Sequence, residues 1–408
     1  MNINPTNQEE IIMKNFKKVL SVMLVLVMAL GLFTACGGKK PSDGGATGGP
    51  EPKVDTSWYN DSETTFTLTK ANQMYGLAEL AKTKDFAGKT IKLGADIKLN
   101  EVDATILTKW RLGSVVPEQA WTPLGNKDVP FAGNFDGQGY TISGLFVSAA
   151  EDGAGLFGRV AYDITIKNFK LVDSYVKNTQ NYTGVIGYGI VKNVENIYTN
   201  LIIDTYGTGA GGIIGWYDGG YGTKVEDEQT GIAEKWEKSH MTINKCWFDG
   251  EITAGSYANG GIIGGQGKRA KVTLINCLST GSITGGREDG YDRTGGLFGW
   301  MNWEAEYNII NSLAVSTLTS TLDTMTGAMI GDYGAQPAGP TITNSYAVGK
   351  KVIGNDQRNL GLNNKGILKT QDELKSATIE TLFPKLEGET ESPWQAVEGS
   401  TPILKGMK

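Results

Sequence analysis

The chain has 408 residues, 56 of them glycine, a formal net charge of −6 and a single histidine, His240. Glycine is about twice as frequent as the usual ~7%, and the 12 prolines are too few for collagen or for Pro/Gly-rich disorder. One histidine excludes the His-Glu-x-x-His zinc peptidase site, and an acidic chain lacks the basic stripe expected for nucleic acid binding. The composition favours a structural or binding role without a cofactor.

The first 35 residues have the pattern of a secretory signal peptide. Three lysines precede a mainly apolar run from Val19 to Phe33, which is short for a membrane-spanning helix of ~20 residues. The segment Phe33-Thr34-Ala35-Cys36 resembles the lipobox of bacterial lipoproteins, whose cysteine becomes the lipidated N-terminus. We expect removal of residues 1–35 and lipidation of Cys36; the alternative is an uncleaved signal anchor.

Residues 36–58 are rich in glycine, proline and serine and contain little that could form a core. Such a composition predicts a flexible tether. The folded part is expected over residues 59–365, followed by a C-terminal cap over residues 366–408. A lipid followed by a tether and a folded domain is typical of an extracytoplasmic protein held at the bacterial cell surface.

A short motif of glycine, two apolar residues and glycine recurs six times, at intervals of 28 to 49 residues. The copies are Gly155–Gly158, Gly184–Gly187, Gly212–Gly215, Gly261–Gly264, Gly296–Gly299 and, with one extra residue, Gly327–Gly331. Repeats of this length predict a solenoid. The longest interval contains a charged insertion over residues 217–240.

A second column of equivalent positions follows each motif at the end of a β-rich stretch. It consists of Asn168, Asn196, Lys245, Asn276, Asn311 and Asn344. Asparagine favours turns, so we expect these positions to be corners at which side chains hydrogen-bond from one repeat to the next. Each repeat then supplies about three short strands.

These repeats predict an all-β fold, a right-handed parallel β-helix with short helical caps. Stacked parallel strands ~4.8 Å apart pair every backbone group with the repeats above and below. The right hand is expected because parallel crossovers almost always have it. A β-propeller is the alternative fold, although each repeat is short for a blade of four strands.

Both ends of the array carry signals for caps. Thr69 is a candidate N-cap of a helix, and Thr370-Gln-Asp-Glu373 has the pattern of a capping box. We expect Trp394 and Pro402-Ile403-Leu404 to cover the last repeat as a lid. The apolar face of the first helix would consist of Met74, Leu77, Ala78 and Ala81.

Two segments, Trp121–Gly125 and Phe131–Val147, followed by GAGLFG at residues 153–158, carry a family resemblance. They resemble the start of GLUG-motif proteins, which are glycine-rich repeat regions of bacterial lipoproteins and adhesin-like proteins. In some immunoglobulin A-cleaving enzymes such repeats lie beside a peptidase domain. The resemblance covers residues 66–404 and implies structural or adhesive repeats with no catalytic residues.

Aromatic side chains gather just after the repeated motif, where stacked repeats would align them along one edge. They are Tyr188, Trp216, Tyr217, Trp300, Trp303 and Tyr333. Aligned rings are suited to stacking against sugars, and the alternative is that they pack together and close the core. Trp236 in the insertion is a further candidate for a protein or glycan contact.

Acidic residues give two weaker candidates. Asp136 is expected to be a turn residue that accepts backbone hydrogen bonds, with a role in calcium binding or acid catalysis as the alternative. Glu288, Asp289 and Asp292 supply oxygens of the kind that calcium prefers, against a solvated loop as the alternative.

Cys246 and Cys277 occupy the same column, 31 residues and one repeat apart. A Cα separation of ~4.8 Å lies within the disulfide range of ~4.4–6.8 Å. In-register parallel neighbours are poorly oriented for a bridge, so stacked buried thiols are favoured over a disulfide.

Together these patterns predict a binding, adhesion or display module whose partners are the membrane, through its lipid, and a glycan or a host or matrix protein. The alternative function is a carbohydrate-active enzyme, because many of these enzymes are parallel β-helices. Such an enzyme would place two carboxylates about 5–10 Å apart in a groove.

Overall fold

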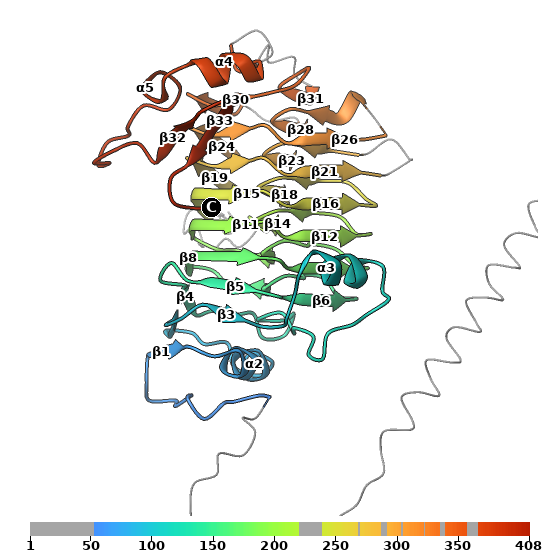
Figure 1. The fold of residues 1–408 in the computed structure, drawn as a ribbon, viewed down its shortest axis with the longest axis vertical. Helices are drawn as coiled ribbons and strands as arrows, with labels where there is room; N and C mark the ends of the chain where they lie inside the picture. Colours follow the sequence, from blue (N-terminus) through green and yellow to red (C-terminus); the bar gives the residue numbers. More distant parts are fainter. Residues whose placement is uncertain are drawn as a thin grey trace, which may run out of the picture. The chain divides into compact units, whose positions relative to one another are not determined.

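The computed structural model describes residues 53–219, 239–267, 270–286, 292–302, 305–321, 323–334, 339–356 and 366–408. The predictions for the signal peptide, for Cys36, for most of the tether and for insertion residues 220–238 lie outside the described residues. Within them, four sheets are parallel and a fifth is an antiparallel hairpin (Figure 1). The expected all-β class with parallel sheets is confirmed.

Sheet A is the largest sheet, and each of its main strands comes from the next repeat along the chain. In spatial order these strands are β1 (Thr65–Leu68), β2 (Thr90–Leu93), β4 (Asn134–Asp136), β8 (Thr165–Val172), β11 (Asn193–Thr199), β15 (Ser239–Phe248), β19 (Ala270–Ile275), β24 (Glu306–Ile310) and β29 (Thr341–Thr343). Shorter strands extend it: β3 (Ile97–Lys98), β5 (Thr141–Ser143), β20 (Leu278–Ser279), β25 (Leu313–Ala314) and β30 (Tyr346–Ala347).

Three further parallel sheets are built in the same way, so that a typical repeat adds one strand to each. Sheet B contains β7 (Phe157–Val160), β10 (Ile186–Gly189), β14 (Ile214–Tyr217), β18 (Ile263–Gln266), β23 (Phe298–Met301), β28 (Ile330–Tyr333) and β31 (Ile353–Asp356). Sheet C contains β6 (Phe146–Ala149), β9 (Tyr175–Asn178), β12 (Ile202–Thr205), β16 (Glu251–Ala254), β21 (Ser282–Gly285) and β26 (Thr317–Thr319). Sheet D contains β13 (Ala210–Gly211), β17 (Asn259–Gly260), β22 (Thr294–Gly295) and β27 (Thr326–Gly327), which follows the 3-10 turn Asp323–Met325.

The repeated glycine motif leads into six of the seven strands of sheet B, where backbones pass very close together. A Cβ on Gly187 would lie 2.4 Å from the Ala154 nitrogen, and one on Gly215 would lie 2.5 Å from the Thr183 nitrogen. Any side chain there would force the layers apart, so these glycines are required for close packing.

The column of asparagines forms the predicted corners. All six positions, Lys245 included, have left-handed backbone with φ between 44° and 60°. Asn196 Nδ2 donates to Asn168 Oδ1 at 3.1 Å, and Asn168 Nδ2 donates to Asp136 Oδ1 at 3.0 Å. The predicted hydrogen bonds between repeats are confirmed for these layers.

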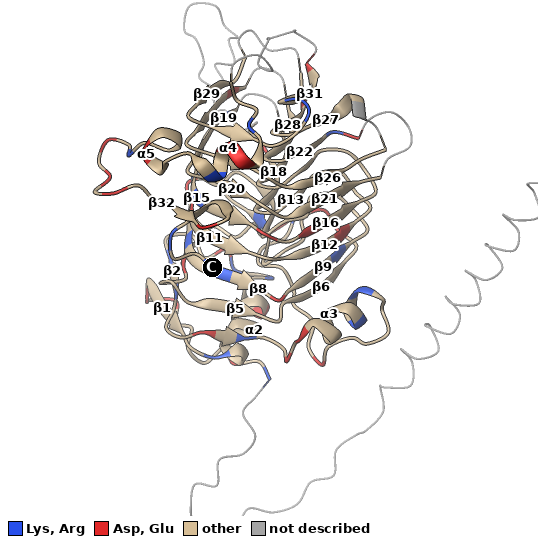
Figure 2. Ribbon diagram, turned by 45° about the horizontal axis from the view of Figure 1, so that its top comes forward, with Lys and Arg blue, Asp and Glu red and all other residues tan. Residues whose placement is uncertain are grey.

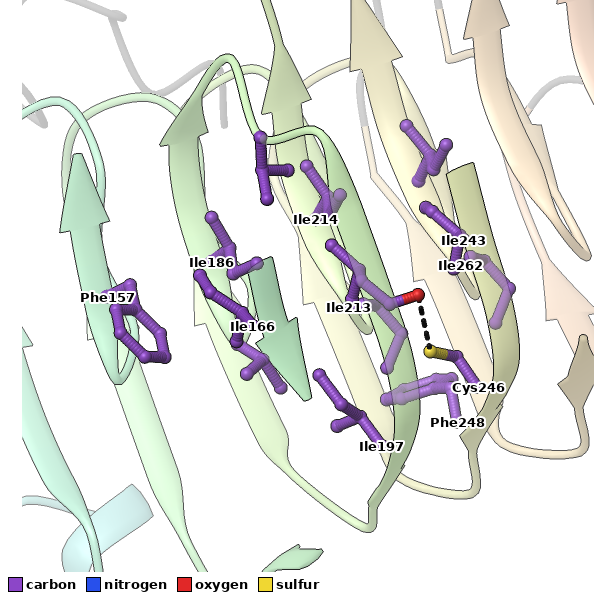
Figure 3. Packing of buried hydrophobic residues seen from close by; sticks show 14 of the residues in the cluster. Phe157, Ile166, Ile186, Ile197, Ile213, Ile214, Ile243, Cys246, Phe248 and Ile262 are labelled. Atoms are coloured by element: carbon purple, nitrogen blue, oxygen red, sulfur yellow. Dashed lines mark hydrogen bonds between the residues drawn. The ribbon is translucent and has the colours of Figure 1, made fainter. Parts of the chain in front are cut away.

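The core lies between the sheets and is made of in-register apolar columns (Figure 3). Sheet B contributes Phe157, Ile186, Ile214, Ile263, Phe298 and Ile330, and sheet A contributes Ile166, Val194, Ile243, Leu274 and Ile309. Because each column continues through every layer, every repeat buries its apolar side against its neighbours.

The N-terminal end is covered by helix α2 (Ala71–Leu80), whose predicted apolar face is buried. The predicted cap is corrected by one residue, because the N-cap is Lys70 and not Thr69. Gln73 Oε1 accepts from the backbone N–H groups of Thr69 at 2.8 Å and Lys70 at 3.2 Å. A glutamine inside the helix therefore satisfies the donors at its start.

The C-terminal segment is formed by α4 (Gln371–Ser376), α5 (Ile379–Leu382), β32 (Trp394–Val397) and β33 (Ser400–Leu404). The capping box is confirmed: Glu373 N donates to Thr370 Oγ1 at 3.1 Å, and Thr370 N donates to Glu373 Oε2 at 2.6 Å. The prediction of a lid over the last repeat alone is corrected, because this segment contacts several repeats. It packs along the outer face of sheet A, against a stripe from four layers, Tyr198, Trp247, Leu278 and Leu313.

Helix α3 (Ala104–Arg111) was not anticipated from the sequence. Asp103 Oδ1 caps it by accepting from Ile106 N at 2.7 Å, and Trp110 packs against Phe146 and Tyr175 beside sheet C. Among the described residues, every helix is too short or too polar to cross a membrane.

Candidate functional site

The outer face of sheet B carries a column of residues that point away from the core. The parallel register aligns Arg159, Tyr188, Trp216, Gly265 and Trp300 on successive strands from β7 to β23. The three aromatic side chains are half-buried, whereas the next residues along their strands, Gly189, Tyr217 and Met301, are buried. The predicted alignment of these rings is therefore present.

Two more tyrosines, from the turns that precede sheet B, join this column. Tyr182 lies 4.9 Å from Tyr188 and 5.3 Å from Trp216, measured between ring centroids. Trp216 and Trp300 are 5.7 Å apart, and Tyr257 lies 6.0 Å from Trp300. We call these five rings, Tyr182, Tyr188, Trp216, Tyr257 and Trp300, the aromatic ladder.

Gly265 makes the ladder continuous, although its strand supplies no ring. A Cβ at this position would lie 2.5 Å from Cζ3 of Trp216 and 2.9 Å from its Cε3. The indole ring therefore occupies the space over β18 that a side chain would fill. This position allows Trp216 to reach Trp300, which lies two layers away.

An arginine covers a ring at each end of the ladder. The Arg159 guanidinium lies 4.4 Å from the centre of Tyr188, and that of Arg293 lies 4.3 Å from the centre of Trp300. Such cation–π contacts fix the outer rings.

Carboxylates accompany both arginines. Arg293 Nε forms an ion pair with the buried Asp332, and Arg159 lies 3.9 Å from Asp152. Burial raises the pKa of Asp332, while Arg293 acts in the opposite direction. The basic groups at the ladder are thus balanced by acidic groups.

The hydroxyl of Tyr188 donates to Oδ2 of Asp218, at the end of β14. Burial raises the pKa of Tyr188, and the hydrogen bond to Asp218 adds to this shift. The phenol therefore remains protonated at neutral pH, and this bond places Asp218 beside Tyr188, at the same end of the ladder as Arg159.

The ligand-facing prediction is corrected for Tyr217, which is 0% exposed. Its hydroxyl donates to Ser239 Oγ at 2.9 Å, and the strand alternation that turns Trp216 outward turns Tyr217 inward. Tyr333 is likewise in the core. Trp236 and Trp303 lie outside the described residues. The sequence patterns did not indicate four residues of this site, Tyr182, Tyr257, Arg159 and Arg293. These residues come from turns or from positions whose role depends on the register of the strands.

The acidic candidates are bonded within the fold. Asp136 Oδ1 accepts from Gln138 N at 3.0 Å, as expected for a turn residue. Asp292 is buried and accepts hydrogen bonds from Thr294 Oγ1 at 2.7 Å and Asn259 Nδ2 at 3.3 Å, so it is not part of a solvated loop. Glu288 and Asp289 lie outside the described residues. Over the part that is described, no three His, Cys, Asp or Glu side chains are grouped as a metal site would require.

Two carboxylates on sheet C come closest to the pattern expected of a glycosidase. Asp204 on β12 and Glu251 on β16 both contact Arg111 of α3, at 3.1 Å and 2.7 Å. Figure 2 shows the charged residues on these strands and on α3. Tyr175 OH also donates to Asp204, at 3.0 Å. Because Arg111 bridges both acids, this cluster holds α3 against the sheet.

The cysteines are stacked buried thiols, as favoured. Cys246 and Cys277 share one register on neighbouring strands and are free. Cys246 Sγ contacts Val194 O at 3.9 Å, shown as the dashed line in Figure 3. Burial raises the pKa of Cys277 to about 12 and that of Cys246 strongly as well. Neither thiol is suited to nucleophilic or metal chemistry at neutral pH.

A hollow of about 500 Å³ lies between sheet A and the C-terminal segment. Its acidic group, Asp249, accepts from Lys408 Nζ at 2.6 Å, Thr280 Oγ1 at 2.5 Å and Tyr198 OH at 3.2 Å. These bonds tie the end of the chain to sheet A. The carboxylate is therefore occupied in holding the segment in place.

No protein-family model matches the chain, and no solved structure matches it. It is similar to halomucin of Haloquadratum walsbyi, at 32% identity over 113 residues, and to a putative Gly-rich membrane protein of Evansella cellulosilytica, at 28% identity over 82 residues. These alignments cover 25% and 18% of this chain. They span 1% of halomucin and 9% of the Evansella protein, a small fraction of either relative's length.

Proposed function

We propose that this protein is a lipid-anchored solenoid of the bacterial cell surface that binds its ligand through the aromatic ladder. The ligand would be a glycan or an extracellular protein. The protein would act by rigid display of a contact surface, with no chemical reaction. The GLUG-motif repeats that the sequence resembles fit such a structural or adhesive role.

The proposed architecture is a right-handed parallel β-helix. Its support is the succession of sheets: a typical repeat passes through sheets D, B, A and C before the next repeat pairs with it in parallel. The right hand follows from the general preference of parallel crossovers. This arrangement gives the outer face of sheet B a fixed spacing between rings.

The proposed anchor is Cys36, followed by the tether over residues 36–58. We expect the wild-type chain expressed in a bacterium to incorporate a labelled fatty acid and to sediment with membranes. Cys36→Ser should abolish the label. A label that persists in Cys36→Ser would contradict lipidation at this residue.

The observation that carries the binding proposal is the exposure of in-register rings on a regular sheet. Three layers present Tyr188, Trp216 and Trp300 to solvent on one face. Rings needed only for packing would be turned inward, as Tyr217 is. Half-exposed aromatic side chains with polar neighbours are typical of binding surfaces.

The test is an array of glycans and extracellular-matrix proteins probed with the wild-type chain and with Trp216→Ala. We expect wild-type protein to bind one class of ligand and Trp216→Ala to lose that signal. Tyr162→Ala is the matched control, because Tyr162 is 55% exposed and makes no ring contact with the ladder among those described. Absence of any wild-type signal would contradict the binding function.

A carbohydrate-active enzyme is the second candidate, favoured by the pairing of Asp204 and Glu251 around Arg111. In a retaining or inverting enzyme both acids must reach the scissile bond, whereas here the guanidinium lies between them. Release of reducing sugar by wild-type protein, lost in Asp204→Asn, would favour this candidate over simple binding.

A further inference from the structure

We propose that the ligand of the aromatic ladder is a neutral, unbranched polysaccharide whose chain runs across the strands of sheet B. This inference rests on the binding function proposed above and narrows it to one class of ligand. It is carried by three features of the ladder: the placement of Trp216, the spacing of the layers and the balance of charges.

Trp216 provides a platform for a sugar ring. The indole lies over Gly265, with Tyr182 and Trp300 beside it. Because the backbone is on one side of the indole, its half-exposed surface is turned to solvent. A pyranose with mainly equatorial substituents has a flat C–H face that stacks on such a ring.

The ladder repeats in the direction in which the layers stack. Neighbouring parallel strands are ~4.8 Å apart, close to the length of one sugar unit in an extended polysaccharide. Tyr188, Trp216 and Trp300 lie on β10, β14 and β23, so the rings follow one line across four strands. A polymer with a regular repeat can match this line along its whole length, whereas the surface of a typical globular protein does not repeat at this spacing.

The charges favour a neutral ligand. Arg293 is paired with Asp332, and Arg159 has Asp152 as its nearest acidic partner. Asp218 adds a third carboxylate at the ladder, through its bond with Tyr188. Among the described residues, these three acidic groups outnumber the two basic groups, a balance that would repel a polyuronate or a sulfated glycan.

The same polar groups suit hydroxyls. Carboxylates accept hydrogen bonds from vicinal hydroxyl groups, and guanidinium groups donate to them. Asp218 and Arg159 both contact Tyr188 at one end of the ladder, and Arg293 contacts Trp300 at the other. The ladder thus combines a stacking surface with the hydrogen-bonding groups that orient a sugar.

The experiment is isothermal titration of the full chain with β-1,4-linked hexasaccharides of glucose and mannose. Polygalacturonate and dextran sulfate serve as the anionic probes. We expect a neutral hexasaccharide to bind with little change between about 0.05 and 0.5 M salt, because screening acts on charged ligands. The anionic polymers should bind at least tenfold more weakly.

Three variants locate the site. Trp216→Ala should lower the affinity for the neutral hexasaccharide at least tenfold. Gly265→Ala should also weaken binding, because its Cβ displaces the indole ring without removing it. Tyr162→Ala should bind as the wild type does. Thermal melting of each variant establishes that it is folded, and Trp216→Leu replaces Trp216→Ala if the smaller residue prevents folding.

The outcomes separate this inference from the binding function itself. Tight binding of an anionic polymer, or of an array protein, that depends on Trp216 would overturn the neutral polysaccharide and leave the binding function intact. Binding of the hexasaccharide that is unchanged in both Trp216→Ala and Gly265→Ala would overturn the ladder as its site. If the wild-type protein binds none of the titrated saccharides and no ligand on the array, both proposals are contradicted.

Discussion

At the corners of sheet A, the left-handed backbone explains why one residue type recurs. Asparagine tolerates a φ of 44–60° better than most residues. Its amide also bonds to the next layer, as Asn196 does to Asn168. Lys245 is the exception, since it adopts φ 52° without a side chain suited to either role.

We predict that Lys245→Asn stabilises the protein by about 0.5–1 kcal/mol, because it relieves unfavourable left-handed backbone. Urea denaturation of wild type and variant measures this change. Lys271→Asn, on the regular strand β19, is the control and should give no gain, since asparagine is disfavoured in strands. A loss of stability in Lys245→Asn would contradict this explanation of the corners.

At the scale of elements, the C-terminal segment stabilises sheet A from outside. The Phe383 and Trp394 rings stack with centroids 4.0 Å apart, and Trp394 Nε1 donates to Asn276 Oδ1 at 3.2 Å. Asn311 Nδ2 donates to Pro384 O at 2.7 Å. In these layers the corner asparagines bond to the segment, whereas Asn168 and Asn196 bond to each other.

We predict that Trp394→Ala destabilises the protein by about 3–5 kcal/mol, as large-to-small changes in a core do. Trp394→Phe should cost less, because it keeps the stacking on Phe383. Hydrogen exchange measures where the loss falls: protection should decrease in residues 366–408 and at β20 and β25. Unchanged protection there in Trp394→Ala would contradict the role of the segment.

The sequence predicted the elements whose signal repeats along the chain. The glycine motif, the corner asparagines, the buried face of α2 and the capping box at Thr370 are all local or periodic patterns. Helix α3 and the path of the C-terminal segment were not predictable in this way. They depend on contacts such as Trp110 with Phe146, between residues far apart in the chain.

At the candidate site, the sequence could not predict the register in which the strands stack. A motif shows that Trp216 and Tyr217 are adjacent, and strand alternation implies that one of them faces inward. Whether Trp216 or Tyr217 faces inward depends on the residue at which the strand begins. Arg159 and Arg293 could be assigned to the ladder only once the layers were aligned.

At the scale of the whole molecule, the interior contains several tyrosines that resist ionisation. Burial raises the pKa of Tyr75 and of Tyr217 to about 12 and that of Tyr307 well above its usual value. In an unfolded chain a tyrosine ionises near pH ~10. These tyrosines therefore contribute stability that is present below pH ~10 and is lost as pH rises toward ~12.

We predict that the free energy of unfolding falls between about pH 10 and pH 12. It should fall less in Tyr217→Phe, which lacks one of the ionisable groups. Urea titrations at each pH measure it, with phenolate absorbance as a second signal. Buried tyrosines should ionise only as the protein unfolds. Full ionisation in a protein that remains folded would contradict their burial.

The proposed function depends most on the aromatic ladder being the surface that binds the ligand. The most direct test is hydrogen exchange of the full chain with and without the ligand selected on the array. We predict that added protection falls on residues 182–189, 209–218 and 293–301. Protection confined to sheet C around Asp204, or to the C-terminal segment, would contradict ligand binding at the aromatic ladder.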